Sequence, residues 1–300
     1  MRILLFFVVF NVLFLGQGKA QEEQWAAVMQ AESRYDFKET YTRLTKRLAE
    51  NSELKIFAEI DHSQNGREVG LELAPARLII FGNAKAGTPL MQNRQVAGLD
   101  LPLKILLGED EKGKVFLAYS DVDHLRTRHA LKSRKILNNI KKSLKDIAKD
   151  VTGRNPNKTG RYKIRYKEGI ESYNSSHSFN ETLTRLINEI TVMDGMRLFA
   201  KIDHTKNAEK LGMGLRPATL LVFGNPVVGT ELMQEARLSA LELPVKMLVW
   251  RDEAGAVKIS YNSSEFLSTR FRINKNLEAL RKIEKVQAEL VQKAAGHPSE

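Results

Sequence analysis

The chain repeats itself at a fixed distance of 142 residues. Phe57-Ala58-Glu59-Ile60-Asp61-His62 returns as Phe199-Ala200-Lys201-Ile202-Asp203-His204, and Phe81-Gly82-Asn83 returns as Phe223-Gly224-Asn225. Over 93 consecutive positions, from Phe37 to His129, 38 residues are identical to the residue 142 positions later, and no gap is needed. A single register over this length indicates a duplicated domain, and a period of 142 is far too long for a solenoid unit.

The duplication predicts two domains of the same fold, each large enough for its own core. We expect the first domain at 21–130 and the second at 161–272. A connector at 131–160 would join them, and a helix at 273–300 would close the chain.

The first twenty residues have the pattern of a secretory signal peptide. Met1-Arg2 gives a positive start, Ile3–Leu15 is almost wholly apolar, and Gly18 and Ala20 are small residues before a cleavage site. A membrane anchor is the alternative, but the apolar run is shorter than the roughly 20 residues that a span needs. We therefore expect a periplasmic or secreted protein.

The chain has no cysteine. Its absence suits an oxidising compartment, since no thiol can mispair there. It also excludes cysteine-ligated zinc, iron–sulfur clusters and thiol catalysis.

Hydrophobic periodicity in each copy predicts the order β-α-β-β-α-β-β-α. Leu44 and Leu48 lie on one stripe of an expected helix, while short apolar runs that end at glycine or proline are typical of strands. The expected strands are 26–33, 56–60, 77–81, 104–107 and 115–119, then 162–173, 198–202, 219–223, 246–250 and 257–261. The expected helices are 37–49, 91–99 and one that starts near 121, then 179–190, 233–241 and one that starts near 263. The fold class is α+β, with helices on one face of a largely antiparallel sheet.

Several short motifs recur in both copies and together resemble the domain-of-unknown-function 302 family. They are Ile-Asp-His, Leu-x-Pro, Phe-Gly-Asn, Gly-Thr-x-Leu-Met, Leu-x-Leu-Pro and a late hairpin with Asp-x-x-Gly. The second copy has Pro226 after Phe-Gly-Asn, whereas the first has Ala84. The resemblance implies a compact α+β fold akin to the TATA-binding-protein-like architecture, a domain that pairs, and no established reaction. Two fused copies would then form an internal pseudo-dimer.

The positive charge of the chain is concentrated between the two copies. The segment Lys132–Lys167 has 13 lysines and arginines but only two acids, Asp146 and Asp150. Within it, 131–151 predicts a basic amphipathic helix, and 273–293 predicts a second one. Either these helices pack an apolar stripe on the domains and expose lysines to water, or the segment binds an anionic surface or an acidic protein. Nucleic acid is an unlikely partner for an exported protein.

The polar residues that both copies retain are the candidate ligand-binding residues. They are Asp61, His62, Asn83, Lys104 and Tyr119 in the first copy and Asp203, His204, Asn225, Lys246 and Tyr261 in the second. The Asp-His pairs could supply an acid–base group, or they could be hydrogen-bonded turns at strand ends. The asparagines could bind a ligand, or they could serve turns that need a positive φ.

No known catalytic motif or cofactor-binding motif is present, and no cofactor is indicated. A non-catalytic binding or interaction module of the cell envelope is therefore the favoured function. The alternatives are an enzyme that uses the Asp-His pairs, or a periplasmic metal-binding protein in which Met91 and Met233 join the two histidines. A methionine at a helix start is more often a core residue, so no metal site is assigned.

Overall fold

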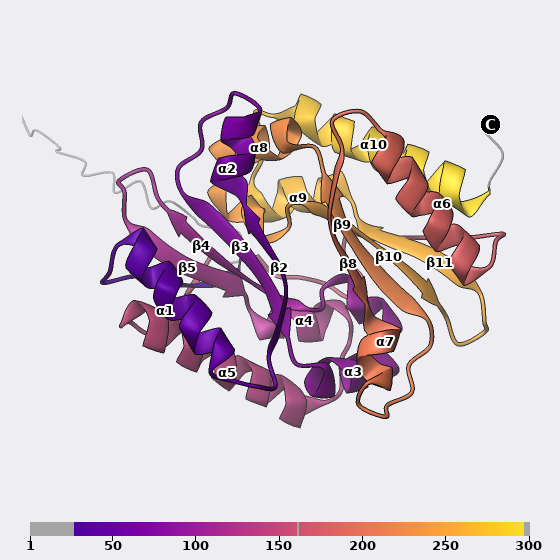
Figure 1. The fold of residues 1–300 in the computed structure, drawn as a ribbon, viewed down its shortest axis with the longest axis horizontal. Helices are drawn as coiled ribbons and strands as arrows, with labels where there is room; N and C mark the ends of the chain where they lie inside the picture. The colour runs from indigo at the N-terminus through magenta and orange to yellow at the C-terminus, as the bar shows by residue number, and fades with distance from the viewer. Residues whose placement is uncertain (1–26, 161, 297–300) are drawn as a thin grey trace, which may run out of the picture.

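The computed structural model describes residues 27–160 and 162–296, and the expected signal peptide lies outside this part of the chain. It contains two antiparallel sheets, with strand orders β2-β3-β4-β5-β1-β6 and β7-β11-β10-β9-β8 (Figure 1). The first sheet consists of β1 (Val28–Glu32), β2 (Lys55–Asp61), β3 (Ala76–Gly82), β4 (Leu103–Glu109), β5 (Val115–Ser120) and β6 (Asn157–Thr159). The second consists of β7 (Ile170–Asn174), β8 (Arg197–Asp203), β9 (Ala218–Gly224), β10 (Val245–Arg251) and β11 (Val257–Asn262).

The helices repeat in the same order in both copies. The first copy has α1 (Phe37–Ala49), α2 (His62–Glu68), α3 (Ala84–Asn93), the 3-10 helix η1 (Gln95–Leu99), α4 (Val122–Arg128) and α5 (Arg134–Thr152). The second has α6 (Phe179–Val192), α7 (His204–Glu209), α8 (Pro226–Glu235), the 3-10 helix η2 (Arg237–Leu241), α9 (Ser264–Phe271) and α10 (Leu277–Ala295). Corresponding elements begin about 142 residues apart, so the predicted tandem α+β fold is confirmed.

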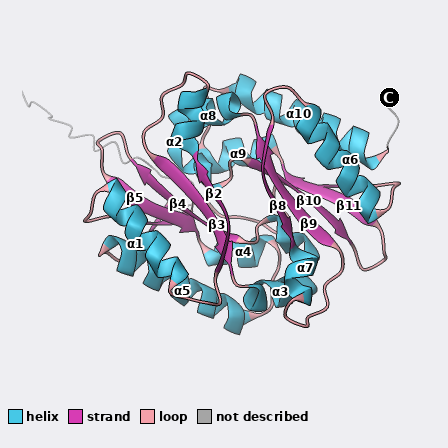
Figure 2. Cartoon of the chain, in the orientation of Figure 1, coloured by secondary structure: helices cyan, strands magenta, loops and turns pink. Residues whose placement is uncertain are grey.

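Each sheet has one face covered by the long helices of its own copy (Figure 2). In β3, Ile79 and Phe81 point to the face that α1 and α5 cover, and they share a core with Leu44 and Leu144. The second sheet is covered by α6 and α10 in the same way. Alternate strand residues point to opposite faces, so the neighbouring residues of β3 lie on the other side of the sheet.

The two copies meet through these other faces. Leu78 and Ile80 share one core with Leu220, Val222 and Leu248 of the second copy. The η1 segment packs on β9 and β10, η2 packs on β3 and β4, α2 lies beside α8, and α3 lies beside α7. Each contact has its counterpart with the copies exchanged, which is the self-complementary arrangement of a two-fold interface. The chain is thus an internal pseudo-dimer.

The basic helix α5 is the last helix of the first copy and not only a connector. It packs on α1, β1 and β5, as α10 packs on α6, β7 and β11. Its apolar stripe is buried, and basic side chains such as Lys135, Lys142 and Lys149 are exposed on the opposite side. The expected amphipathic packing of both helices is confirmed, although Leu277, which was expected on the apolar side of α10, is 45% exposed.

The strand expected at 162–173 begins only at Ile170. The alternation of Tyr162, Ile164 and Tyr166 with basic residues was misleading, because a turn folds this segment back on itself. The backbone N–H of Arg165 donates to a carboxylate oxygen of Glu168 at 2.6 Å, and Gly169 has a φ of +63°. The strand itself starts at the position that corresponds to Val28.

Helices in the first part of each motif region were also misplaced. The helices expected at 91–99 and 233–241 begin earlier, at Ala84 and Pro226, and each ends in a separate 3-10 helix. The helices α2 and α7, which follow Asp61 and Asp203 directly, were read as strand-end turns. They are only 7 and 6 residues long, too short for a helical period to be visible in the sequence. None of the helices in the described residues is long and apolar enough to cross a membrane.

The turn before β7 depends on Gly169. A Cβ atom added there would lie 2.3 Å from Cβ of Phe266, whereas one added at Gly212, which also has positive φ, meets nothing within 4 Å. We expect Gly212→Ala to destabilise the protein by about 1 kcal/mol, the backbone cost of left-handed alanine. Gly169→Ala should cost clearly more, because the steric overlap is added. Urea unfolding of both variants measures the difference, and equal losses would contradict the described packing.

Candidate functional site

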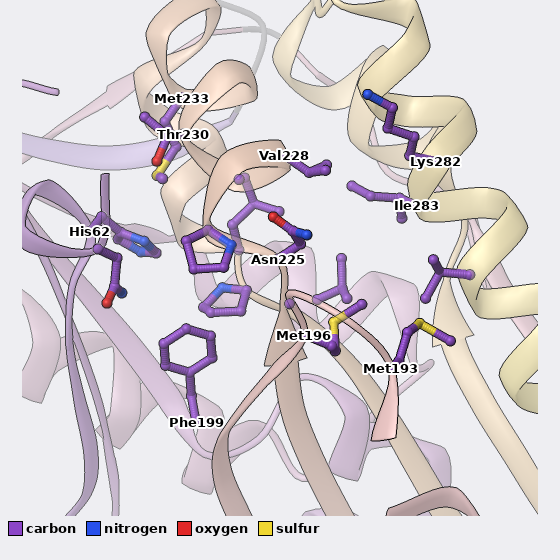
Figure 3. Close-up of a pocket in the computed structure, with 18 of the residues that line it drawn as sticks. His62, Met193, Met196, Phe199, Asn225, Val228, Thr230, Met233, Lys282 and Ile283 are labelled. Atoms are coloured by element: carbon purple, nitrogen blue, oxygen red, sulfur yellow. The ribbon is translucent and has the colours of Figure 1, made fainter. Parts of the chain in front are cut away.

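Two pockets lie where the copies meet, and each is lined by both. The second-copy pocket has a volume of about 240 Å³ and combines His62 and Asn65 of the first copy with residues of the second, including Asn225, Thr230 and Met233. The first-copy pocket, of about 410 Å³, combines His204 and Asn207 with residues of the first copy, including Asn83, Thr88 and Met91. The two pockets are equivalent under the 142-residue shift. Figure 3 shows the second-copy pocket, with His62 facing Asn225 and Met233 across it and Met193, Met196 and Ile283 along the opposite side.

The recurring motifs are explained by the walls of these pockets. Asn83 and Asn225 cap the N-termini of α3 and α8: their side-chain oxygens accept hydrogen bonds from the backbone N–H groups of Lys85 at 2.8 Å and Val227 at 2.9 Å. The turn interpretation of the asparagines is therefore right in kind, but their φ values are −111° and −95°, so a positive φ is not the reason. The caps place both asparagines at the pocket rims.

The glycine of each Phe-Gly-Asn motif is required by space. A Cβ atom at Gly82 would lie 3.2 Å from Cβ of Pro102, and one at Gly224 would lie 3.2 Å from Cβ of Pro244. Both prolines follow cis peptide bonds, and both line a pocket. The Leu-Pro motif thus packs directly against the Phe-Gly motif of its own copy.

His62 and His204 reach across the pseudo-dimer. The Nε2 atom of His204 lies 3.1 Å from the carbonyl oxygen of Gly98, in the other copy. His62, 3% exposed, lies against the corresponding backbone at Ala240. Burial lowers the pKa of each histidine to about 4, because the charged imidazolium is poorly solvated there. The Nε2 atom of His62 is buried without a hydrogen-bond partner among the described residues.

Asp61 and Asp203 cap α2 and α7. Asp61 accepts hydrogen bonds from the backbone N–H of Gln64, the hydroxyl of Ser63 and the guanidinium of Arg77. Burial opposes ionisation of Asp61, but these three donors together hold its pKa below the usual range. Asp203 accepts from the backbone N–H of Lys206 at 2.8 Å. Neither carboxylate has a hydrogen bond to its neighbouring histidine in the described structure, so the geometry disfavours an Asp-His acid–base pair.

Lys104 and Lys246 do not line the two pockets with the histidines. They belong to an ion cluster at the centre of the pseudo-dimer, which we define as Asp100, Lys104, Arg128, Glu242, Lys246 and Arg270. The amino group of Lys246 lies 2.7 Å from a carboxylate oxygen of Glu242 and 3.4 Å from one of Asp100. That of Lys104 lies 3.4 Å from Glu242. Each lysine therefore contacts the acid of the opposite copy.

The two arginines of the ion cluster complete its pseudo-symmetry. Arg128 donates to Asp100 of its own copy at 2.8 Å and to Asn262 of the second copy at 2.8 Å. Arg270 donates to Glu242 of its own copy at 2.6 Å and to the hydroxyl of Ser120 in the first copy at 2.9 Å. Residues 120 and 262 correspond under the repeat. Both arginines are fully buried, so their hydrogen bonds act in a medium of low dielectric constant.

The ion cluster changes the proton affinity of its members. Burial opposes ionisation of Asp100 and Glu242, but the surrounding cations hold both carboxyl pKa values well below the usual range. Burial lowers the pKa of Lys104 to about 7; Glu242 opposes this shift and the neighbouring Lys246 adds to it. Burial also disfavours the charged form of Lys246, yet its contacts with Glu242 and Asp100 raise its pKa.

The remaining candidates are separate from the pockets. Tyr119 is buried beside the ion cluster, and burial raises its pKa. The hydroxyl of Tyr261 donates to Glu171 at 2.8 Å, and its ring stacks on that of Tyr173. No group of three or more His, Asp or Glu side chains that could hold a metal ion occurs within 27–160 and 162–296. The methionine and histidine of the copper alternative do line one pocket together, but from opposite copies.

Sequence reasoning missed the arginines and acids of the ion cluster. Arg128 and Arg270 are identical at the 142-residue distance, and Asp100 and Glu242 both precede the Leu-Pro motif. These repeats were available in the sequence. Their burial was not, because an arginine near a helix end normally reaches water.

The buried histidines make the fold sensitive to acid. With pKa values near 4 when folded and 6.5 when unfolded, the unfolded state binds more protons between these values, so stability falls as the pH drops from 6.5 to 4. Each histidine should contribute about 2–3 kcal/mol of this loss at pH 4.5. We expect the variant His62→Gln/His204→Gln to lose about 5 kcal/mol less than the parent between pH 7 and pH 4.5. Urea midpoints at both values measure this, and His124, whose pKa is also lowered by burial, is unchanged in both proteins. Equal acid sensitivity would contradict the assignment.

Comparison with known proteins places this geometry in a family. The chain is 41% identical over 102 residues to proteins named Fluoride-specific ion channel FluC 1 from Brucella suis and from Brucella abortus. The match covers 34% of this chain and only 40% and 37% of those proteins. A crystal structure of an uncharacterized conserved DUF302 protein from Bacillus stearothermophilus matches 42% of this chain and 98% of that one, with 22% identity and a TM-score of 0.39. The model of the family described as Domain of unknown function DUF302 matches residues 29–150 and again residues 171–293. This chain therefore belongs to the DUF302 family and contains two copies of its domain.

Proposed function

We propose that this protein is a non-catalytic binding module of the cell envelope, and that its two pockets take up small, largely apolar molecules. The carrying observation is that motif residues from both copies line the same pockets. Neither copy forms its pocket alone, since His62 lies in the second-copy pocket and His204 in the first-copy pocket. The expected signal peptide supports a place in the envelope.

The lining suggests how such a molecule would bind. Met193, Met196 and Phe199 provide adaptable apolar surface in the second-copy pocket. The buried Nε2 atom of His62 and the hydroxyl of Thr230, which has no partner in the described residues, offer polar contacts. Apolar walls with a few polar groups are the usual composition of small-molecule sites, and volumes of about 240 and 410 Å³ suit compact ligands.

An enzyme that uses the Asp-His pairs is less well supported. Both histidines are buried and their pKa values lie far below neutral pH, while both aspartates serve as helix caps. A general base needs a reachable atom and a pKa near the working pH.

Filling the second-copy pocket tests the proposal. Val228 lines this pocket, whereas Val227, the preceding residue of α8, is 36% exposed and does not line it. With 1-naphthol as a fluorescent probe, we expect saturable binding to the parent protein at both pockets. Val228→Trp should weaken binding at one of the two by more than 10-fold, and Val227→Trp should leave both unchanged. Absence of saturable binding, or equal binding to both variants, would refute the proposal.

A separate surface supports a second role. The exposed lysines of α5 form one stripe opposite its buried residues: Lys135, Lys142, Lys145 and Lys149. We propose that this stripe binds an anionic surface, as the concentration of charge in 132–167 suggests.

Vesicle sedimentation tests this second role. Phosphatidylglycerol vesicles should sediment the protein at low salt and release it at high salt, while phosphatidylcholine vesicles should not bind it. Lys142→Gln/Lys145→Gln should weaken binding several-fold. The matched change Lys201→Gln/Lys210→Gln, at exposed lysines of the second copy, should have little effect. Equal loss in both variants would remove the stripe as the binding surface.

A further inference from the structure

The ion cluster contains more buried cations than carboxylates. Two lysines and two arginines surround Asp100 and Glu242, and all four cations are at least nine-tenths buried. The two carboxylates are already well supplied with donors: Asp100 contacts Arg128, Lys246 and His129. Buried cations in excess of their counter-charges are unfavourable, since they have given up water without a full replacement.

A small cavity adjoins the ion cluster on the side of Lys104. Its volume is about 30 Å³, close to the volume that one water molecule takes up in the liquid, and it is lined by Lys104, Ser120, His124 and the two carboxylates of the ion cluster. Asp121, the third acid of the lining, has a partner of its own in Lys158 at 2.8 Å. The cavity therefore has the size of a single small molecule or ion.

The groups around this cavity include donors whose capacity is not used by the described residues. Lys104 has three N–H donors, and its one acceptor there is Glu242 at 3.4 Å, which is long for a charged hydrogen bond. The Nδ1 atom of His124, a residue 6% exposed, is buried without a hydrogen-bond partner in the described part of the chain. The hydroxyl of Ser120 receives a hydrogen bond from Arg270, which leaves its proton able to donate.

We propose that the cavity beside Lys104 binds one inorganic anion of halide size. The surplus of buried cations supplies the attraction, and Lys104, His124 and Ser120 supply the donors. The site lies between the copies and is distinct from the two pockets described above. It exists on one side of the pseudo-dimer only, because the residue that corresponds to His124 is Phe266.

Anion-dependent stability of the full chain tests this site. In buffers of equal ionic strength at pH 7, replacing gluconate by chloride or bromide should raise the melting temperature by about 2–4 °C, with a saturable dependence on halide concentration. Sulfate, which is larger, should give no saturable increase beyond that of gluconate. If chloride, bromide and gluconate give the same melting temperature, the proposal is wrong.

Three variants separate this site from the exposed basic surface. His124→Phe installs the residue that the second copy has at this position, and Lys104→Met removes the main donor while keeping its length. Both should lose the halide response. Lys142→Met, at an exposed lysine of α5, should keep it. A response that survives the first two changes, or disappears with the third, would overturn the assignment.

Crystals soaked in bromide give a direct measurement that does not depend on how the variants fold. An anomalous difference peak within hydrogen-bond distance of Lys104 Nζ is expected. Peaks confined to exposed lysines would identify an adventitious ion only and would refute the proposal.

Discussion

The pairing of buried charges across the two copies is the interaction on which this molecule depends. Each acid that precedes the Leu-Pro motif contacts a lysine from the opposite copy, and each arginine reaches both its own acid and a polar residue of the other copy. Buried ion pairs add little net stability, because desolvation offsets much of the attraction, but an unmatched buried charge is very costly. The ion cluster therefore penalises any arrangement of the copies that separates these partners. It specifies one orientation, while the apolar sheet faces around it supply most of the favourable free energy.

The two pockets follow from that orientation. Once the sheets meet as they do, α2 is placed beside α8 and α7 beside α3. His62 and His204 then enter pockets that are otherwise built by the opposite copy. A single domain would leave each pocket without its histidine, so a pocket of this kind requires a paired domain. Fusion of two copies in one chain makes the pairing intramolecular and independent of protein concentration.

Fusion also allows the two halves to diverge. In a homodimer, both pockets must be identical, whereas here the second-copy pocket has Met193 and Gly195 where the first-copy pocket has Asn51 and Glu53. Glu53 pairs with Lys85 at the rim of the first-copy pocket, and the residue that corresponds to Lys85 is Val227. The larger pocket is thus more polar, and the smaller one is more apolar. The change from His124 to Phe266 beside the ion cluster is a further asymmetry of the same origin.

The sequence by itself determined the duplication, the α+β class, the family and the amphipathic packing of α5 and α10. These features follow from register, from alternation and from helical period, which are local in the chain. It also identified the histidines and asparagines that line the pockets, because both copies retain them. The sequence could not assign His62 to the pocket of the opposite copy, since that depends on contacts between residues more than a hundred positions apart. Nor could it show that Arg128 and Arg270 are buried, because an arginine leaves water only where the folded chain supplies Asp100, Glu242 and their neighbours. Tertiary structure alone decided those partners, since burial and charge pairing are properties of the assembled pair of copies.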